Sequence, residues 1–264
     1  MRSTNPVLSR PDAFTPQQRP YQPFDQYGNP VPGYQGAPPE SAGVMTIDDV
    51  ITKSAVTMGT LIAVAGVTFM LLPVSLLYPA LIVSGLVGFV TVLLVSFRRV
   101  VNPALVLAYS AIEGVFIGAF SLLFEMMYPG IVTQAVLGTF VAAGVTLAAY
   151  KYFRIRVTNK FRKMVLMSTM AFAGVMLVNF VLSLFNINLG LRDIGPEAGM
   201  LAIAASALGV VLAVFNLIMD FDYIEQGIAM RAPASESWRG AFGLTVTMVW
   251  LYTELLRILS YFRR

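Results

Sequence analysis

The sequence predicts an all-α integral membrane protein with seven transmembrane helices, on two features of composition and one of pattern. Of the 264 residues, 57% are hydrophobic and only 12% are charged, whereas soluble domains carry about 25% charged residues. The mean hydropathy is +0.72, so polar side chains are too few to cover a surface that faces water. Seven apolar stretches follow one another along the chain, each close to the ~20 residues that cross a bilayer core.

The seven helices are expected at about 54–72, 78–97, 103–124, 130–150, 164–185, 199–221 and 240–261. Most of the remaining prolines fall at the junctions between these stretches, where helices begin or end. Before the first stretch, Thr46 or Asp48 can cap a helix N-terminus. Small residues such as Gly114 and Gly118 recur inside the stretches, and small residues let helix backbones approach each other in lipid.

The first 43 residues differ from the rest of the chain. They hold nine of the fifteen prolines and no apolar run. Such a composition cannot bury a core. We therefore expect a disordered, Pro-rich cytoplasmic tail over 1–43 and a seven-helix transmembrane domain over 44–264.

The charges between the stretches predict the orientation in the membrane. The segment 151–163 carries six Lys and Arg residues and no acid, and Arg98-Arg99 is also basic, whereas the segments near 73–78 and 125–129 carry no Lys or Arg. The positive-inside rule then places the N-terminus in the cytoplasm, for a multi-pass protein of the cell (plasma) membrane. Seven spans place the C-terminus outside. Arg263-Arg264 argues against that side, and a short or re-entrant last helix would resolve the conflict.

Several classes of function are excluded or disfavoured by residue content. The net charge is +4. The basic residues lie in short loops between apolar stretches, which fits membrane orientation better than nucleic-acid binding. The absence of Cys and His excludes disulfides, Cys/His zinc sites, haem ligation by His and a histidine base. Neither a phosphate loop nor a dinucleotide fingerprint is present. We expect no enzyme and no cofactor, so any proton or metal chemistry must use carboxylates.

Four carboxylates sit at or inside the apolar stretches, namely Glu113, Asp220, Asp222 and Glu254. A charged residue at the centre of a span costs about 2.5–3.5 kcal/mol on insertion scales, and such acids commonly mark ion or proton paths.

Each of these acids also has a structural explanation. Asp220 and Asp222 could sit at the water boundary, because the end of the sixth helix is uncertain. Glu254 could form an ion pair with Arg257, three residues further along the same helix face. Glu113 could make a hydrogen bond between helices.

Two acids that face each other inside the membrane would give the protein sensitivity to pH. Such a pair repels when both members are ionised, so it would share a proton near neutral or mildly acidic pH unless a cation lies between them. Calcium prefers oxygen ligands and suits such a position. The acids therefore predict a pH-sensitive cation gate that works without histidine.

Three segments of the chain resemble the transmembrane Bax inhibitor motif family, in its bacterial Bax-inhibitor/YccA-like branch. They are Asp220–Ile224 after the sixth apolar stretch, Leu251–Leu259 around Glu254, and the small-residue segment Tyr109–Gly118. The resemblance covers roughly residues 45–264.

The resemblance implies six helices around a central C-terminal helix and a calcium leak sensed by acids on the last two helices. Asp220 matches the first acid, and Glu254 stands where the family usually has Asp. Asp222 falls at a position that is commonly polar. Arg98 or Arg99 would be the counter-ion of the closed state.

The function expected from the sequence is thus a pH-sensitive leak channel for cations, with Ca²⁺ as the transported ion or as an ion bound by Asp220 and Glu254. Glu113 and Arg257 would support this site. The alternative is a regulatory membrane protein without transport, which binds a membrane protease or another envelope protein. In both cases the lipid bilayer is the surrounding partner.

Overall fold

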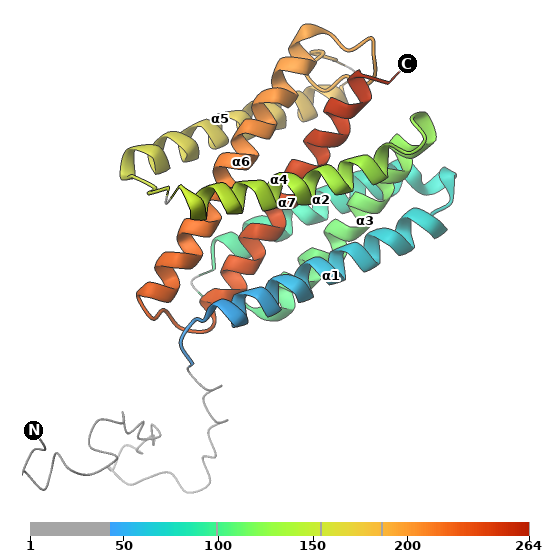
Figure 1. Cartoon of the computed structure of the whole chain (residues 1–264). Coiled ribbons are helices and arrows are strands. Elements are labelled where there is room, and N and C mark those ends of the chain that lie inside the picture. The colour runs from blue at the N-terminus through green and yellow to red at the C-terminus, as the bar shows by residue number, and fades with distance from the viewer. Residues whose placement is uncertain (1–42, 99, 154, 186, 264) are drawn as a thin grey trace, which may run out of the picture. The chain divides into compact units, whose positions relative to one another are not determined.

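The computed structural model describes residues 43–98, 100–153, 155–185 and 187–263, so the expected tail lies almost wholly outside the described residues. These residues form seven α-helices and one short 3-10 helix (Figure 1). The elements are α1 (Ile47–Leu71), η1 (Val74–Leu76), α2 (Leu77–Ser96), α3 (Pro103–Met127), α4 (Ile131–Tyr152), α5 (Asn159–Leu184), α6 (Met200–Ala229) and α7 (Glu236–Tyr261). All seven described α-helices are long and apolar enough to cross a membrane, which confirms the predicted fold class of a multi-pass helical membrane protein.

Polar residues just before the helices cap α1, α3 and α5. The backbone N–H of Asp49 donates to Thr46 Oγ1 at 3.2 Å, so Thr46 is the cap of α1. Asn102 caps α3 by accepting from the N–H of Ala104 at 2.9 Å, and Pro103 occupies the first helical position. Proline suits that position, because its missing N–H would have no partner inside the helix.

Helix α6 continues to Ala229, so the expected end of the sixth helix near residue 221 is wrong. The apolar stretch ends where the chain reaches water, but the backbone hydrogen bonds of a helix do not have to end there. Asp222 is buried against a partner on α5, described below, which stabilises the extra turns. The helix stops just before Arg231, which has a positive φ of 54°.

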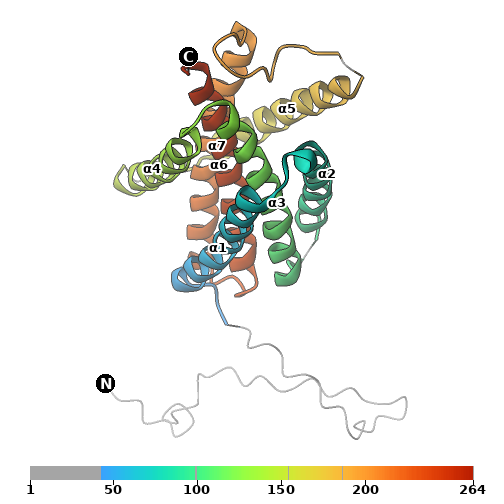
Figure 2. The same ribbon diagram turned by 90° about the vertical axis from the view of Figure 1, so that its right-hand side faces the viewer.

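Helix α7 packs closely against α1, α3, α4 and α6, while α2 lies on α3 and α5 lies on α6 (Figures 1 and 2). Helix α5 reaches α7 through the ring of Phe172, which stacks on Trp250 with 5.7 Å between ring centroids. The expected arrangement of six helices around a central last helix is therefore not confirmed. Four helices contact α7 closely, and the other two lie further out.

The closest backbone approach brings α1 against α3. A Cβ atom added at Gly114 would lie 2.8 Å from the carbonyl oxygen of Leu61, and one added at Gly118 would lie 2.5 Å from that of Ala65. Glycine is needed at both positions because the backbone of α1 occupies the space that a side chain would fill. Small residues have the same role in other contacts between membrane helices.

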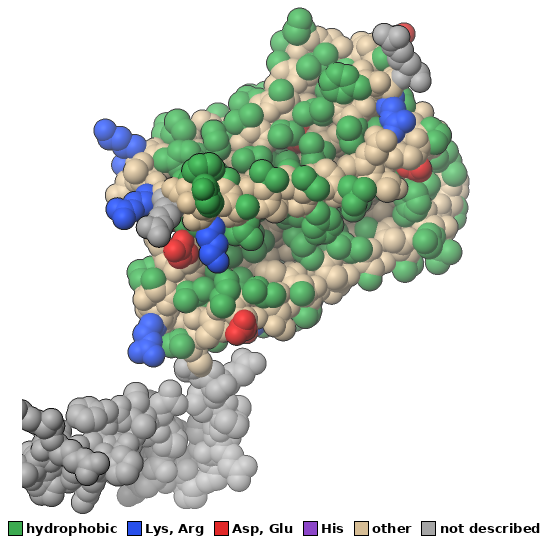
Figure 3. Space-filling view, in the orientation of Figure 1, with side chains coloured by type: hydrophobic (Ala, Val, Ile, Leu, Met, Phe, Trp, Pro, Cys, Tyr) green, Lys and Arg blue, Asp and Glu red, His purple; other side chains and the backbone are tan. Residues whose placement is uncertain are grey.

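Hydrogen bonds join the start of α1 to the α6–α7 connection, at what we call the basic end of the bundle. The Met45 N–H donates to the carbonyl of Ala232 at 2.7 Å, and Lys53 Nζ donates to that of Ala234 at 2.8 Å. The seven alternating helices place the α2–α3 and α4–α5 connections at this end as well. Figure 3 shows Lys and Arg side chains where α4 passes into α5, and hydrophobic side chains over the middle of the same face. We call the other end, with the α3–α4 and α5–α6 connections, the opposite end.

Candidate functional site

Asp220 faces α7 from α6 through a neutral partner. Its Oδ2 atom accepts a hydrogen bond from Thr247 Oγ1 at 2.6 Å. A Cβ atom added at Gly243 would lie 3.0 Å from Oδ1. Gly243 and Thr247 are one helical turn apart, so the Asp220 carboxylate lies at their height on α7, and the glycine provides the space for it.

Glu254 faces α6 from α7 and is completely buried, with 0% of its surface exposed. Arg192 Nη1 donates to both carboxylate oxygens, at 2.7 and 2.9 Å. Arg192 comes from the α5–α6 connection, and 26% of its side chain is exposed. A Cβ atom added at Gly209 would lie 2.8 Å from the carboxyl carbon of Glu254, so a glycine again makes room for the acid.

The structure does not bring Asp220 and Glu254 together. Glu254 lies at the height of Gly209, and the eleven residues from Gly209 to Asp220 correspond to about 16 Å along α6. Measured along α7, the seven residues from Thr247 to Glu254 correspond to about 10 Å. One bridging water joins groups about 5–6 Å apart. The predicted proton-sharing pair is therefore absent from this structure, because Thr247 faces Asp220 and Gly209 faces Glu254.

A single calcium ion cannot bind to both acids in this arrangement. Calcium–oxygen distances are about 2.3–2.6 Å, and calcium takes six to eight oxygen ligands. Within the described part of the chain, no group of three or more Asp or Glu residues could hold a metal ion. The two carboxylates are therefore separate positions along the contact between α6 and α7, which we call the α6–α7 seam.

A cavity of 280 Å³ lies beside Asp220, toward the basic end. Its lining includes Ser96 at the end of α2, Tyr223 on α6 and Arg239 on α7. Asp220 thus combines a neutral hydroxyl partner with open space and a nearby cationic side chain, whereas Glu254 has an ion partner in direct contact.

Asp222 on α6 has a structural role, because its partner Arg162 lies near the start of α5. It accepts hydrogen bonds from Arg162 Nη2 at 2.9 Å and from Gln226 Nε2 at 2.6 Å. Two residues along a helix correspond to a rotation of about 200°, so Asp222 points away from the seam that Asp220 faces. Its ion pair with Arg162 joins α5 to α6.

Of the two arginines expected as counter-ions at the end of α2, the structure describes only Arg98. Arg98 is exposed, and its backbone carbonyl accepts from Arg239 Nη2 at 3.3 Å. In the described residues Arg98 forms no salt bridge, and Arg99 lies outside them. The arginine that neutralises Glu254 is Arg192, from the α5–α6 connection.

Glu113 and Arg257 do not lie between Asp220 and Glu254. A Cβ atom added at Gly88 would lie 2.9 Å from Glu113 Oε2, so Glu113 is at the contact of α2 with α3. Arg257 Nη1 donates to the backbone carbonyl of Arg192 at 2.9 Å, and its guanidinium lies over the Phe120 ring at 5.4 Å. Arg257 therefore holds the connection that carries Arg192, instead of forming the expected ion pair with Glu254.

Two residues of this site were missed by reasoning from the sequence. Arg192 is the only Lys or Arg in the segment 186–199, which the predicted orientation places on the side of the membrane that usually has few basic residues. An isolated arginine there was a usable signal. Thr247 gave none, because a hydroxyl in a membrane helix commonly bonds only to its own backbone.

Comparison with protein families matches residues 5–264 to the family described as Bax inhibitor 1 like. The match begins within the Pro-rich segment, earlier than the resemblance at about residue 45. A search of curated proteins found no match.

Proposed function

Because the chain belongs to the Bax inhibitor 1 like family, we propose that it is a pH-sensitive leak channel for cations, Ca²⁺ among them, whose path follows the α6–α7 seam. In this proposal Asp220 attracts the cation near the basic end, and Glu254 is the position where the path is closed.

The observation that carries the proposal is the pairing of a completely buried carboxylate with an arginine from outside the helices. A buried ionised carboxylate needs a compensating charge. Glu254 obtains it from Arg192, which belongs to a connection and is 26% exposed. Movement of that connection removes the counter-charge without unfolding a helix. A metal cation can then take the place of the guanidinium at Glu254.

Asp220 supplies the sensitivity to pH in this proposal. Its partner is the neutral hydroxyl of Thr247, and a cavity lies beside it. A carboxylate without a fixed cationic partner in direct contact can bind either a proton or a passing cation. Proton concentration and cation passage are thereby linked at one side chain.

The test is calcium flux into liposomes that contain the purified full-length protein and a trapped calcium indicator. The wild type is expected to raise flux above that of protein-free liposomes and to change that flux with pH, because one carboxylate binds either a proton or a cation. Asp220→Asn is expected to lose the pH response. Asp222→Asn is the matched control, because it removes an acid from the same helix that points away from the seam.

Flux no greater than in protein-free liposomes at every pH would overturn the proposal. That result would favour the alternative of a regulatory membrane protein that binds a membrane protease or another envelope protein. An unchanged pH response in Asp220→Asn would overturn the role of Asp220 alone.

A further inference from the structure

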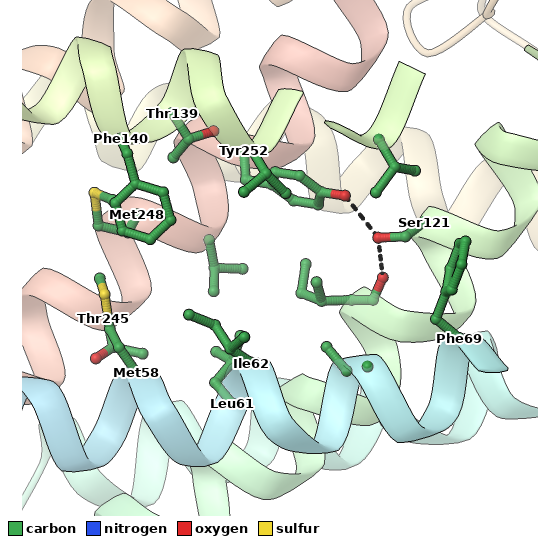
Figure 4. Close-up of a pocket in the computed structure, with 16 residues that line it drawn as sticks. Met58, Leu61, Ile62, Phe69, Ser121, Thr139, Phe140, Thr245, Met248 and Tyr252 are labelled. Atoms are coloured by element: carbon green, nitrogen blue, oxygen red, sulfur yellow. Dashed lines mark hydrogen bonds between the residues drawn. The ribbon is translucent and has the colours of Figure 1, made fainter. Parts of the chain in front are cut away.

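A second cavity, of 360 Å³, lies between α1 and α4, and we call it the lateral slot. Its walls and floor include Met58, Ile62 and Phe69 from α1, Phe140 from α4, and Met248 and Tyr252 from α7 (Figure 4). Both α1 and α4 pack against α7, but they do not pack against each other within the described residues. The slot is therefore a gap between two neighbouring membrane helices, with α3 and α7 behind it.

The polar atoms in the slot already have partners. Ser121 Oγ and Tyr252 Oη are 2.6 Å apart, and the hydroxyls of Thr139 and Thr245 donate to backbone carbonyls of their own helices at 2.7 and 2.8 Å. The other lining side chains are apolar. A buried water needs two to four polar partners. The slot therefore favours an apolar occupant over water.

The slot is continuous with the surface that faces lipid. Ile62 and Phe140 line it, and 52% and 49% of their respective surfaces are exposed on helices that cross the membrane. An opening at such a surface faces acyl chains, since they are the solvent at that depth.

The length of the slot suits an extended chain. Its lining residues on α1 run from Met58 to Phe69, and eleven residues of a helix correspond to about 16 Å. The hydrocarbon thickness of one leaflet is ~15 Å. One acyl chain of a leaflet can therefore lie along the slot over its whole length.

We propose that the lateral slot is a binding site for one acyl chain of a membrane phospholipid, which lies between α1 and α4 and contacts Met248 and Tyr252 on α7. This proposal does not rest on the proposed leak function. The occupied site would place lipid against the helix that carries Glu254.

The test uses full-length protein in phosphatidylcholine vesicles that contain a small share of phosphatidylcholine with a diazirine midway along one acyl chain. After irradiation, mass spectrometry of peptides measures the label on Met248 and Tyr252, which are only 8% and 7% exposed. The label on Val141, which is 63% exposed on α4, measures contact with bulk lipid. We expect label at the two floor residues of the wild type as well as at Val141.

Two glycines on α1 provide a matched pair of variants. A Cβ atom added at Gly66 or at Gly59 meets nothing within 4 Å, and only Gly66 lines the slot. Gly66→Phe is expected to lower the ratio of floor label to Val141 label by about tenfold, because its ring takes the space of the chain. Gly59→Phe is expected to leave that ratio unchanged.

Two results would overturn the proposal. They are an unlabelled floor in the wild type, and a floor that stays labelled in Gly66→Phe. The wild-type result decides the matter even if a variant fails to fold.

Discussion

The carboxylates at the two ends of the α6–α7 seam have different partners and surroundings. Near the basic end, Asp220 has a neutral hydroxyl partner at 2.6 Å and a cavity beside it. Toward the opposite end, Glu254 is completely buried and is held by an arginine at 2.7 and 2.9 Å. The first acid has room for a cation, and the second already has one in the form of a guanidinium. In the proposed leak channel, this difference puts the barrier to cations at Glu254.

The largest effect on stability is expected when each member of the buried ion pair is removed in turn. Arg192→Gln leaves an unpaired buried carboxylate, so we expect a loss of about 3 kcal/mol in stability, the low end of the range for breaking buried pairs. Glu254→Gln leaves a partly exposed arginine that can turn to water, so about 1.5 kcal/mol is expected. Thermal unfolding of the two variants in the same detergent measures the difference. Equal losses would mean that the burial of Glu254 does not decide the energetics.

A smaller effect is expected from the glycine that makes room for Glu254. Gly209→Ala places a methyl group 2.8 Å from the carboxyl carbon of Glu254, and such overpacking costs about 1–3 kcal/mol. Gly174→Ala on α5 is the control, since its Cβ meets nothing within 4 Å and alanine is the better helix former. The same unfolding measurement should show a lower midpoint for Gly209→Ala alone. A control that is equally destabilised would show that the loss does not come from contact with Glu254.

The smallest effect is expected at the ion pair between Arg162 and Asp222. The Arg162 side chain is 46% exposed, and Gln226 still donates to Asp222 when Arg162 is gone. Because exposed pairs contribute about 0–1 kcal/mol, Arg162→Gln should change stability by less than about 1 kcal/mol and leave calcium flux unchanged. A large loss of flux in this variant would show that the seam is not separate from the start of α5.

The sequence predicted the fold well because the membrane constrains it strongly. Seven apolar stretches and the caps and prolines between them indicate seven helices. The end of α6 was missed because apolar periodicity reports where the chain meets lipid, whereas the helix continues as far as its backbone and side chains find partners. Asp222 meets such a partner in Arg162, sixty residues earlier in the chain.

The site was harder to predict than the fold, because it depends on which residues share a height on two antiparallel helices. The sequence indicated that Asp220 and Glu254 lie in apolar helices, and both do. It did not indicate that Thr247 stands opposite Asp220, or that Glu254 stands opposite Gly209 and meets Arg192. Those contacts follow from the register of α6 against α7 and from the path of a connection, neither of which apolar periodicity encodes.

The most direct test of closure by Arg192 is calcium flux through Arg192→Gln in the liposome assay, measured beside the wild type and the double variant Arg192→Gln/Glu254→Gln. If Arg192 closes the path by occupying Glu254, the single variant should leak faster than the wild type, by about tenfold for 1.4 kcal/mol of lost barrier. The double variant should lose that gain, because no carboxylate remains to bind the cation. A folded Arg192→Gln protein whose flux equals that of the wild type would contradict closure of the path by Arg192.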